Sequence, residues 1–181
     1  AYAHQGGAWE APSSTLFAMR RAQAVGAAAL ELDVHASADG ELVVCHDATV
    51  DRTTGGTGAI AGLTLNELRS LDNAYWFVAG EDAVRDRPSS QYPLRGRAPD
   101  DRELGIATLR EVLEAFPGVV LNLDIKQTAP TVEPYEATLA TLLAEFERTD
   151  DVIVSSFDDG AIGAFTACLL YTSPSPRDRQ K

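Results

Sequence analysis

The chain has 181 residues, 45% of them hydrophobic, which is enough for one globular domain with a substantial core. Its formal net charge of −12 opposes binding to nucleic acid or to an anionic membrane surface. No apolar run approaches the roughly 20 residues that a membrane-spanning helix needs, and the first residues lack the pattern of a signal peptide, so we expect a cytoplasmic protein without stable membrane insertion.

Short strands and helices alternate from the N-terminus. Residues 2–5 predict a strand that ends at a Gly-Gly turn. Residues 14–26 predict a helix, with Ser13 or Ser14 as its N-cap and Gly26 as its stop signal. A strand that leads into a helix is the repeating unit of a parallel α/β protein.

Polar and apolar side chains alternate along the next strand, which ends before a turn at residues 37–40. Glu31 and Asp33 face one way and the neighbouring leucine and valine side chains face the other, because successive side chains on a strand point to opposite faces. The apolar run over residues 41–45 predicts a further strand, which closes on His46. The acidic pair is the first indication of a functional site.

Two later segments begin with the Thr-x-x-Glu pattern of a capping box, at Thr64 and Thr108, and therefore predict short helices with well-defined starts. Residues 73–105, between these helices, are rich in proline, arginine and aspartate and show no sustained periodicity. We expect this segment to be an insertion over the active face of the domain, because long irregular segments in compact domains are usually functional loops.

Residues 119–126 repeat the alternation of the acidic strand. Asn122, Asp124 and Lys126 share one face, and apolar side chains share the other. Central strands of an open doubly wound sheet are covered on both faces and are almost continuously apolar, whereas the inner face of a closed (β/α) barrel can be polar where it lines a site. The pattern therefore favours an α/β fold of the TIM-type (β/α) barrel class.

A helix expected at residues 132–147 and a strand at residues 151–157 continue the series of parallel elements. Residues 1–167 fall short of the ~250 residues of a typical closed barrel, so we expect them to be its N-terminal portion, truncated after about the first four or five strands. Residues 168–181 have no amphipathic period and concentrate serine, proline and arginine, which predicts a non-native tail.

Three carboxylates fall on the polar strand faces, at Glu31, Asp33 and Asp124, and their hard oxygen ligands suit one divalent cation, Mg²⁺ or Ca²⁺. His4 and His46 follow strand ends at the same rim, where one can deprotonate an attacking hydroxyl and the other can protonate a departing oxygen. A lysine on the same face as the third carboxylate is suited to neutralise charge that develops on a phosphoryl oxygen.

The same residues have simpler interpretations. Glu31 and Asp33 could form an exposed strand face, and His46 could be a strand-end histidine without a catalytic role. The parity that the acidic pair shares with Asp124 favours the functional interpretation. His35 has the same parity as Asp33 but is predicted to be a solvated loop histidine.

The order of several motifs resembles that of the glycerophosphodiester phosphodiesterases, relatives of the phosphatidylinositol-specific phospholipases C. The resemblance implies a TIM-type barrel that hydrolyses a small-molecule glycerophosphodiester to glycerol 3-phosphate and an alcohol. It also implies an acid/base pair at His4 and His46, metal ligands at Glu31, Asp33 and Asp124, and a phosphate-facing lysine at Lys126. The motifs that carry the resemblance are "AHQGG", "APSSTLFAM", "ELDV", "DGELVVCHD", "DRTTGGTG", "GIATLREVLEAF" and "LNLDIK".

The chain departs from the family pattern where Gln5 replaces an arginine that contacts phosphate, where Ser13 replaces a glutamate, and where Asp124 replaces a longer glutamate. We predict Gln5, Arg52 and Lys126 as substrate contacts, with Arg52 either anchoring its glycine-rich turn or approaching the substrate. The departures leave two alternatives open: a catalytically silent barrel that binds a phosphorylated or polyol ligand, and a lyase that stops at a cyclic phosphate.

Overall fold

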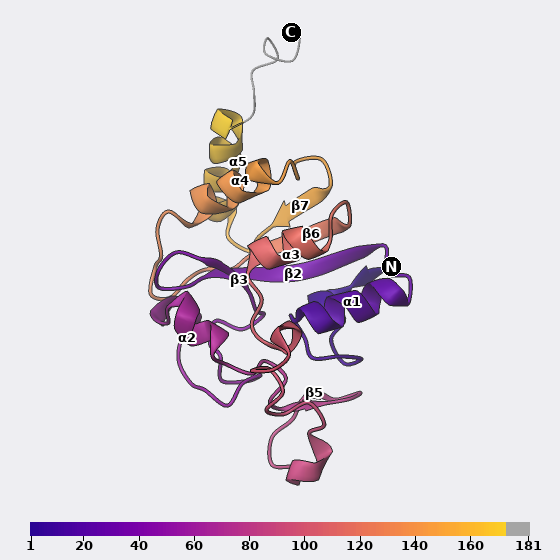
Figure 1. Cartoon of the computed structure of the whole chain (residues 1–181). Coiled ribbons are helices and arrows are strands. Elements are labelled where there is room, and N and C mark those ends of the chain that lie inside the picture. Colours follow the sequence, from indigo (N-terminus) through magenta and orange to yellow (C-terminus); the bar gives the residue numbers. More distant parts are fainter. Residues whose placement is uncertain (173–181) are drawn as a thin grey trace.

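The computed structural model describes residues 1–172 of the chain, and its main sheet is built from parallel strands that are neighbours in chain order (Figure 1). The β3 strand is the exception, because it turns back and pairs antiparallel with β2. The order of the parallel strands is β1 (Tyr2–Ala3), β2 (Ala29–Ala36), β6 (Val120–Ile125) and β7 (Val152–Ser155), and β3 spans Leu42–Val44.

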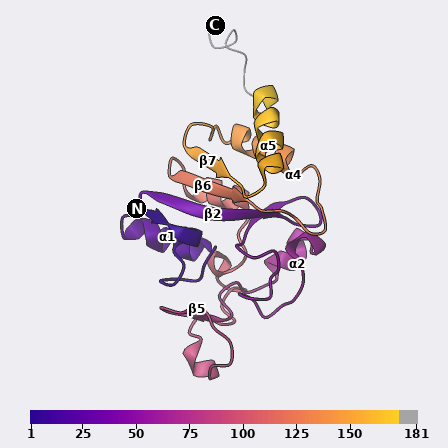
Figure 2. The same ribbon diagram turned by 180° about the vertical axis from the view of Figure 1, so that it is seen from behind.

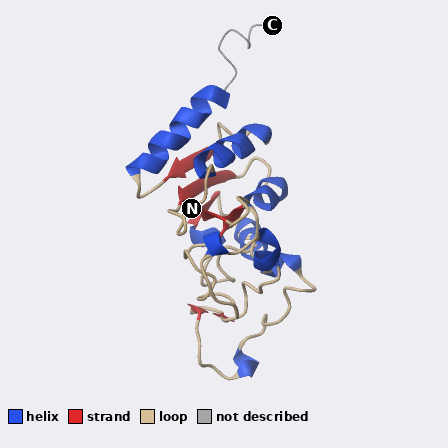
Figure 3. Ribbon diagram, turned by 90° about the vertical axis from the view of Figure 1, so that its left-hand side faces the viewer, coloured by secondary structure: helices blue, strands red, loops and turns tan. Residues whose placement is uncertain are grey.

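Helices cover one face of this sheet, and the connections between successive parallel strands all contain a helix (Figures 2 and 3). Parallel neighbours in chain order with helices on one side are the arrangement of a (β/α) barrel, which has eight such strands when closed. The predicted α/β class and the parallel order are therefore confirmed. The covering helices are α1 (Leu16–Ala24), α3 (Leu109–Ala115), α4 (Tyr135–Glu145) and α5 (Asp159–Thr172), and α2 (Leu65–Arg69) lies beyond β3.

The predicted alternation along β2 and β6 is confirmed and explains the two faces of the sheet. Leu32 pairs with Leu123, and both are buried in the core that the helices share. Asp33 pairs with Asp124 on the opposite face. Because the two strands run in register, all their leucine pairs fall on the helix side and every acidic residue falls on the other side.

The two predicted capping boxes are present. At the start of α3, the Thr108 hydroxyl accepts a hydrogen bond from the Glu111 N–H at 3.1 Å, and the Glu111 carboxylate accepts one from the Thr108 N–H at 2.8 Å. The same reciprocal pair joins Thr64 and Glu67 at the start of α2. These caps satisfy backbone donors that the first turn of a helix would otherwise leave unpaired.

The predicted cap of α1 at Ser13 or Ser14 is wrong, because Thr15 caps this helix. Thr15 has extended backbone angles, and its hydroxyl accepts from the Ala18 N–H at 3.1 Å. Ser14 has φ +59°, which is not the extended conformation of an N-cap.

Several elements are shorter than predicted, β1 and α4 among them. β1 ends at Ala3, and residues His4–Gly6 form a 3₁₀ turn in which Gln5 has φ +49°. The α4 helix begins at Tyr135 instead of residue 132, because the residue before Pro134 is disfavoured in the α conformation.

The prediction of a solvated loop at His35 is wrong. His35 lies inside β2 and is 3% exposed, because β2 continues to Ala36 and its last residues pair with β3.

Residues 73–105 form a lobe beside the sheet, seen at the bottom of Figure 1. The lobe contains a short hairpin of β4 (Phe77–Val78) and β5 (Asp82–Ala83). An arginine stacked among aromatic rings holds it together through cation–π contacts. The Arg95 guanidinium carbon lies 4.3, 4.5 and 3.7 Å from the ring centroids of Tyr75, Trp76 and Tyr92.

The far end of the chain is only partly described. Residues 168–172 belong to α5, and residues 173–181 of the predicted tail lie outside the described residues, so the origin of the tail stays a prediction. Within residues 1–172, no helix is both long and apolar enough to cross a membrane.

The division of the sheet into a buried and an open face predicts different effects of one substitution on neighbouring strands. Ile125 in β6 is 2% exposed on the helix side, and Ile153 in β7 is 52% exposed on the other side. We expect Ile125→Val to lower the free energy of unfolding by about 0.5–1.5 kcal/mol and Ile153→Val to change it little. Urea denaturation followed by circular dichroism measures both, and equal effects would contradict the assignment of the faces.

Candidate active site

Both predicted catalytic histidines lie beside the middle of β2. β1 pairs with the first residues of β2 and β3 with its last residues, on the edge opposite β6. On this edge, β1 and β3 leave a gap beside residues 31–33 of β2. His4 directly follows β1, and His46 follows β3 after Cys45, so the histidines come from the two ends of this gap. The residues of β2 at this gap include Glu31 and Asp33.

Glu31 is held against the turn that carries His4. The Gln5 backbone N–H donates to Glu31 Oε2 at 2.9 Å, and His4 Nε2 lies 4.0 Å from the same oxygen. The His4 side chain is 71% exposed, so its imidazole is open to solvent and to a ligand. Gln5 itself is buried, and its contact with a substrate stays a prediction.

His46 is oriented by its neighbour Asp47. Its Nδ1 lies 2.7 Å from Asp47 Oδ1, and its side chain is 42% exposed. Partial burial by itself raises the pKa of Asp47, but hydrogen bonds from His46 and Arg52 outweigh it and hold that pKa below its ordinary value. Because Nδ1 donates to an ionised carboxylate, Nε2 is left as the reactive nitrogen, which is the arrangement of a general acid or base.

Lys126 lies between the two paired carboxylates of the polar sheet face. Its Nζ is 2.9 Å from Asp33 Oδ1 and 2.6 Å from Asp124 Oδ2. Burial by itself lowers the pKa of Lys126, but the hydrogen bonds to the two carboxylates outweigh it and raise that pKa above its ordinary value. The lysine therefore stays charged, and it compensates two carboxylates that are largely removed from water.

The predicted metal ligands fit a hard cation in their chemistry but are not gathered around one point. Asp33 is 2% exposed, and within residues 1–172 its Oδ2 has no hydrogen-bond partner, as expected for a ligand oxygen. In that same range, no three histidine, cysteine, aspartate or glutamate side chains are grouped closely enough to hold an ion. Lys126 separates Asp33 from Asp124, and Glu31 is turned towards Gln5.

Three residues at this site were not assigned a role from the sequence: His35, Asp47 and Asp82. His35 Nε2 lies 3.4 Å from the carbonyl oxygen of His46, and burial lowers the pKa of His35, so it is a neutral support beneath the loop. Arg52 joins the other two, because its Nε donates to Asp47 at 2.8 Å and its Nη1 to Asp82 at 2.7 Å. The predicted substrate contact of Arg52 stays a prediction.

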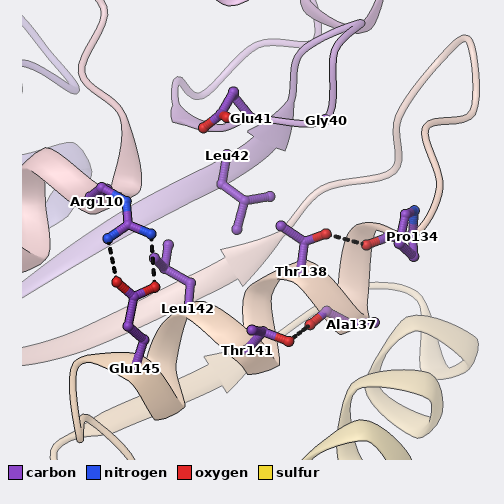
Figure 4. A pocket seen from close by; sticks show the side chains of 10 residues that line it. All are labelled: Gly40, Glu41, Leu42, Arg110, Pro134, Ala137, Thr138, Thr141, Leu142 and Glu145. Carbon is purple, nitrogen blue, oxygen red and sulfur yellow. Dashed lines mark hydrogen bonds and ion pairs between the residues drawn. The ribbon is translucent and has the colours of Figure 1, made fainter.

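A pocket of about 320 Å³ lies away from these residues, among the β2–β3 turn, α3 and α4 (Figure 4). Arg110 and Glu145 on its wall form a two-point ion pair at 2.7 and 2.8 Å. The hydroxyls of Thr138 and Thr141 donate to carbonyl oxygens of their own helix. These polar groups are already paired, so we interpret the pocket as a packing crevice between helices. Another pocket, of about 330 Å³, adjoins Lys126 at the ends of β6 and β7.

Comparison with known proteins identifies the family. Residues 4–169 match the model of the Glycerophosphoryl diester phosphodiesterase family. The chain belongs to this family. It is 35% identical over 158 residues to the glycerophosphodiester phosphodiesterase of Caldanaerobacter subterraneus, covering 86% of this chain and 57% of the relative. It is 41% identical over 162 residues to glycerophosphodiester phosphodiesterase 1 of Bos taurus, covering 87% of this chain and 42% of the relative.

Solved structures confirm the barrel fold, among them that of a glycerophosphodiester phosphodiesterase from Agrobacterium tumefaciens, which aligns with a TM-score of 0.68 and 27% identity over 92% of this chain and 61% of that one. A phosphodiesterase of Oleispira antarctica, in complex with the product sn-glycerol-3-phosphate, aligns with a TM-score of 0.66 and 29% identity over 92% of this chain and 60% of that one. The chain spans about half the length of the curated relatives that it matches.

The position of Lys126 predicts a pH-dependent loss of stability when it is replaced. Lys126→Met leaves the buried Asp33 carboxylate without its counter-charge, so we expect the free energy of unfolding at pH 7 to fall by about 3 kcal/mol. A lysine whose pKa is raised in the folded protein contributes stability at pH values below its ordinary pKa of 10.5. This contribution is lost as the pH rises through the pKa of the lysine in the folded protein. The difference in free energy of unfolding between wild type and Lys126→Met should therefore be smaller at pH values above 10.5 than at pH 7.

The measurement is urea denaturation of both proteins at pH 7 and at pH 11. Arg110→Met is the matched control, because it removes one cation from an exposed ion pair and should have little effect. An equal loss for both variants would contradict the central role of Lys126.

Proposed function

We propose that this protein hydrolyses a glycerophosphodiester to glycerol 3-phosphate and an alcohol, with His4 and His46 as the acid/base pair. The family supports the reaction class. The observation that supports the roles is that Asp47 orients His46, while His4 lies 4.0 Å from Glu31, on the same strand face as Asp33, the partner of Lys126. The product bound to the Oleispira antarctica phosphodiesterase, sn-glycerol-3-phosphate, supports a glycerophosphodiester as substrate.

Each histidine would handle one proton. One removes a proton from the nucleophile, and the other gives a proton to the oxygen of the departing alcohol. The Nε2 of His46 is free for this exchange because Nδ1 is engaged by Asp47. Lys126 would neutralise charge that develops on the phosphoryl oxygens. The nucleophile is either water or the glycerol hydroxyl of the substrate, and the second case gives a cyclic phosphate first.

One divalent cation, Mg²⁺ or Ca²⁺, completes the proposal. Glu31, Asp33 and Asp124 would hold it, and the unpaired buried oxygen of Asp33 is the observation in its favour. When bound, such an ion polarises a phosphoryl oxygen as a Lewis acid. Lys126 engages the other oxygen of Asp33, Oδ1, so the ammonium could stay beside this carboxylate while Oδ2 binds the ion.

A catalytically silent barrel that binds a phosphorylated ligand is the second candidate. Two departures from the family pattern favour it. Gln5 lacks the charge and the two-point hydrogen bonding of an arginine, and the Ser13 hydroxyl is buried without a partner within residues 1–172. Turnover of any diester excludes this candidate, and phosphorus NMR of the product distinguishes a hydrolase from a lyase that stops at the cyclic ester.

The acid/base assignment predicts that a substitution at His46 lowers activity. The test uses the full natural protein that contains these residues. We expect His46→Gln to lower release of glycerol 3-phosphate from glycerophosphocholine by about 10²–10⁴-fold. Glu145→Gln, on the outer face of α4, is the control and should keep full activity. A coupled enzyme assay for glycerol 3-phosphate measures both, and an active His46→Gln protein would remove the central residue of the mechanism.

The cation assignment predicts a binding result that does not depend on turnover. Titration calorimetry should show binding of Mg²⁺ or Ca²⁺ that Asp33→Asn weakens by about tenfold or more, because a neutral amide is a poorer ligand for a hard cation. Asp39→Asn, in the exposed β2–β3 turn, should leave the affinity unchanged. Equal affinities for wild type and Asp33→Asn would overturn the assignment.

A further inference from the structure

Asp82, in the lobe, stands at the far end of a chain of charged hydrogen bonds that reaches His46. Its Oδ2 accepts from Arg52 Nη1 at 2.7 Å, Arg52 Nε donates to Asp47 Oδ2 at 2.8 Å, and His46 Nδ1 lies 2.7 Å from the other oxygen of Asp47. The guanidinium therefore uses two different nitrogens to join two carboxylates from different segments.

Arg52 lies in a loop that is closed by backbone contacts. A backbone bridge between Thr49 and Ala59 closes the loop, and the fully buried Val50 anchors it in a core cluster behind β3. The Thr54 hydroxyl donates to the Val50 carbonyl oxygen at 2.8 Å. Arg52 is therefore presented from a fixed backbone.

The Asp82 end is held as firmly. Trp76 of the lobe donates from Nε1 to the Thr54 carbonyl oxygen at 2.6 Å, and the hairpin tip donates from the Gly80 N–H to the Trp9 carbonyl oxygen at 2.7 Å. The hairpin thus contacts both the loop after His4 and the loop after His46. Asp82 has φ +62°, a conformation that costs free energy for a non-glycine residue and persists only where surrounding contacts impose it.

The hydrogen-bonded series from Asp82 through Arg52 to Asp47 is shielded from solvent more than a surface ion pair is. The Asp82 side chain is 14% exposed, and the side chains of Arg52 and Asp47 are about one-third exposed. Burial by itself lowers the pKa of Arg52, but hydrogen bonds to Asp47 and Asp82 outweigh it and raise that pKa above its ordinary value. Arg52 is thus charged at neutral pH and is held between two carboxylate groups, in a geometry that a solvated pair would not keep.

We propose that Asp82 is a positioning residue for His46 and acts through Arg52 and Asp47. Arg52 donates hydrogen bonds to Asp47 and Asp82 from two different nitrogens, so its guanidinium is held in one orientation. This orientation sets the direction of the Asp47 carboxylate. Asp47 in turn selects the His46 tautomer with the proton on Nδ1, which leaves Nε2 for proton exchange. Without Asp82, the guanidinium is free to turn, and His46 loses its single tautomer.

The catalytic consequence of this proposal rests on the proposed function, but its structural readout does not. The chain contains three histidines, His4, His35 and His46, so ring ¹⁵N resonances are assignable by substitution. Long-range ¹H–¹⁵N correlation spectra, recorded at a pH where the imidazoles are neutral, distinguish the Nδ1–H tautomer from the Nε2–H tautomer.

We expect wild-type His46 to be almost entirely Nδ1–H, and Asp82→Ala to lower the ratio of Nδ1–H to Nε2–H by about tenfold or more, the effect of losing a hydrogen bond to a charged group. Asp82→Asn, which keeps the side-chain volume and one acceptor oxygen, should give an intermediate ratio. Glu81→Ala is the matched control, since Glu81 is the preceding residue and pairs only with the exposed Arg87 in the described structure.

An unchanged His46 tautomer in both Asp82 variants would overturn the proposal. If Asp82→Ala also disturbs His4 and His35, the lobe has been disrupted, and Asp82→Asn alone decides. Where the longest natural chain is active, Asp82→Ala should lower kcat at nearly constant KM, and a change in KM alone would contradict positioning. A shifted tautomer in a protein without diesterase activity would keep the positioning role and refute the proposed function.

Discussion

The polar face of the sheet depends on the ammonium of Lys126, which lies between Asp33 and Asp124. The parallel register of β2 and β6 brings these two carboxylates side by side on a face that is largely shielded from water. Two adjacent buried anions repel each other and lose hydration, so the sheet can keep this register only with a compensating cation. The helix face has no such requirement, because leucine pairs with leucine there.

This separation assigns stability and chemistry to opposite faces of the same strands. The helices bury the apolar side chains of β2 and β6, while the other face carries the carboxylates Glu31, Asp33 and Asp124. Sites built on strands are held more accurately than sites built on loops. The two histidines are exceptions, because His4 lies in a turn and His46 on a loop, and the orientation of His46 has to come from hydrogen bonds.

Local patterns in the sequence were sufficient to predict what depends on local physics. The period of two placed Asp33 and Asp124 on the polar face, and the Thr-x-x-Glu pattern located the start of α3 at Thr108. The buried position of His35 was missed because it follows from the antiparallel return of β3, a tertiary pairing. Asp82 was missed for the same reason, since it lies in a segment without periodicity, 30 positions away from its partner Arg52.

The two histidines are held to different degrees, and this difference follows from where their carboxylates come from. Asp47 adjoins His46 in the chain, and its two oxygens are engaged separately, Oδ1 by His46 and Oδ2 by Arg52. Glu31 belongs to β2, lies 4.0 Å from the exposed His4, and also accepts from the turn backbone. A carboxylate that is a candidate cation ligand cannot also fix an imidazole tightly, so the geometry of His4 depends on what binds at the sheet face, whereas the geometry of His46 depends on the lobe.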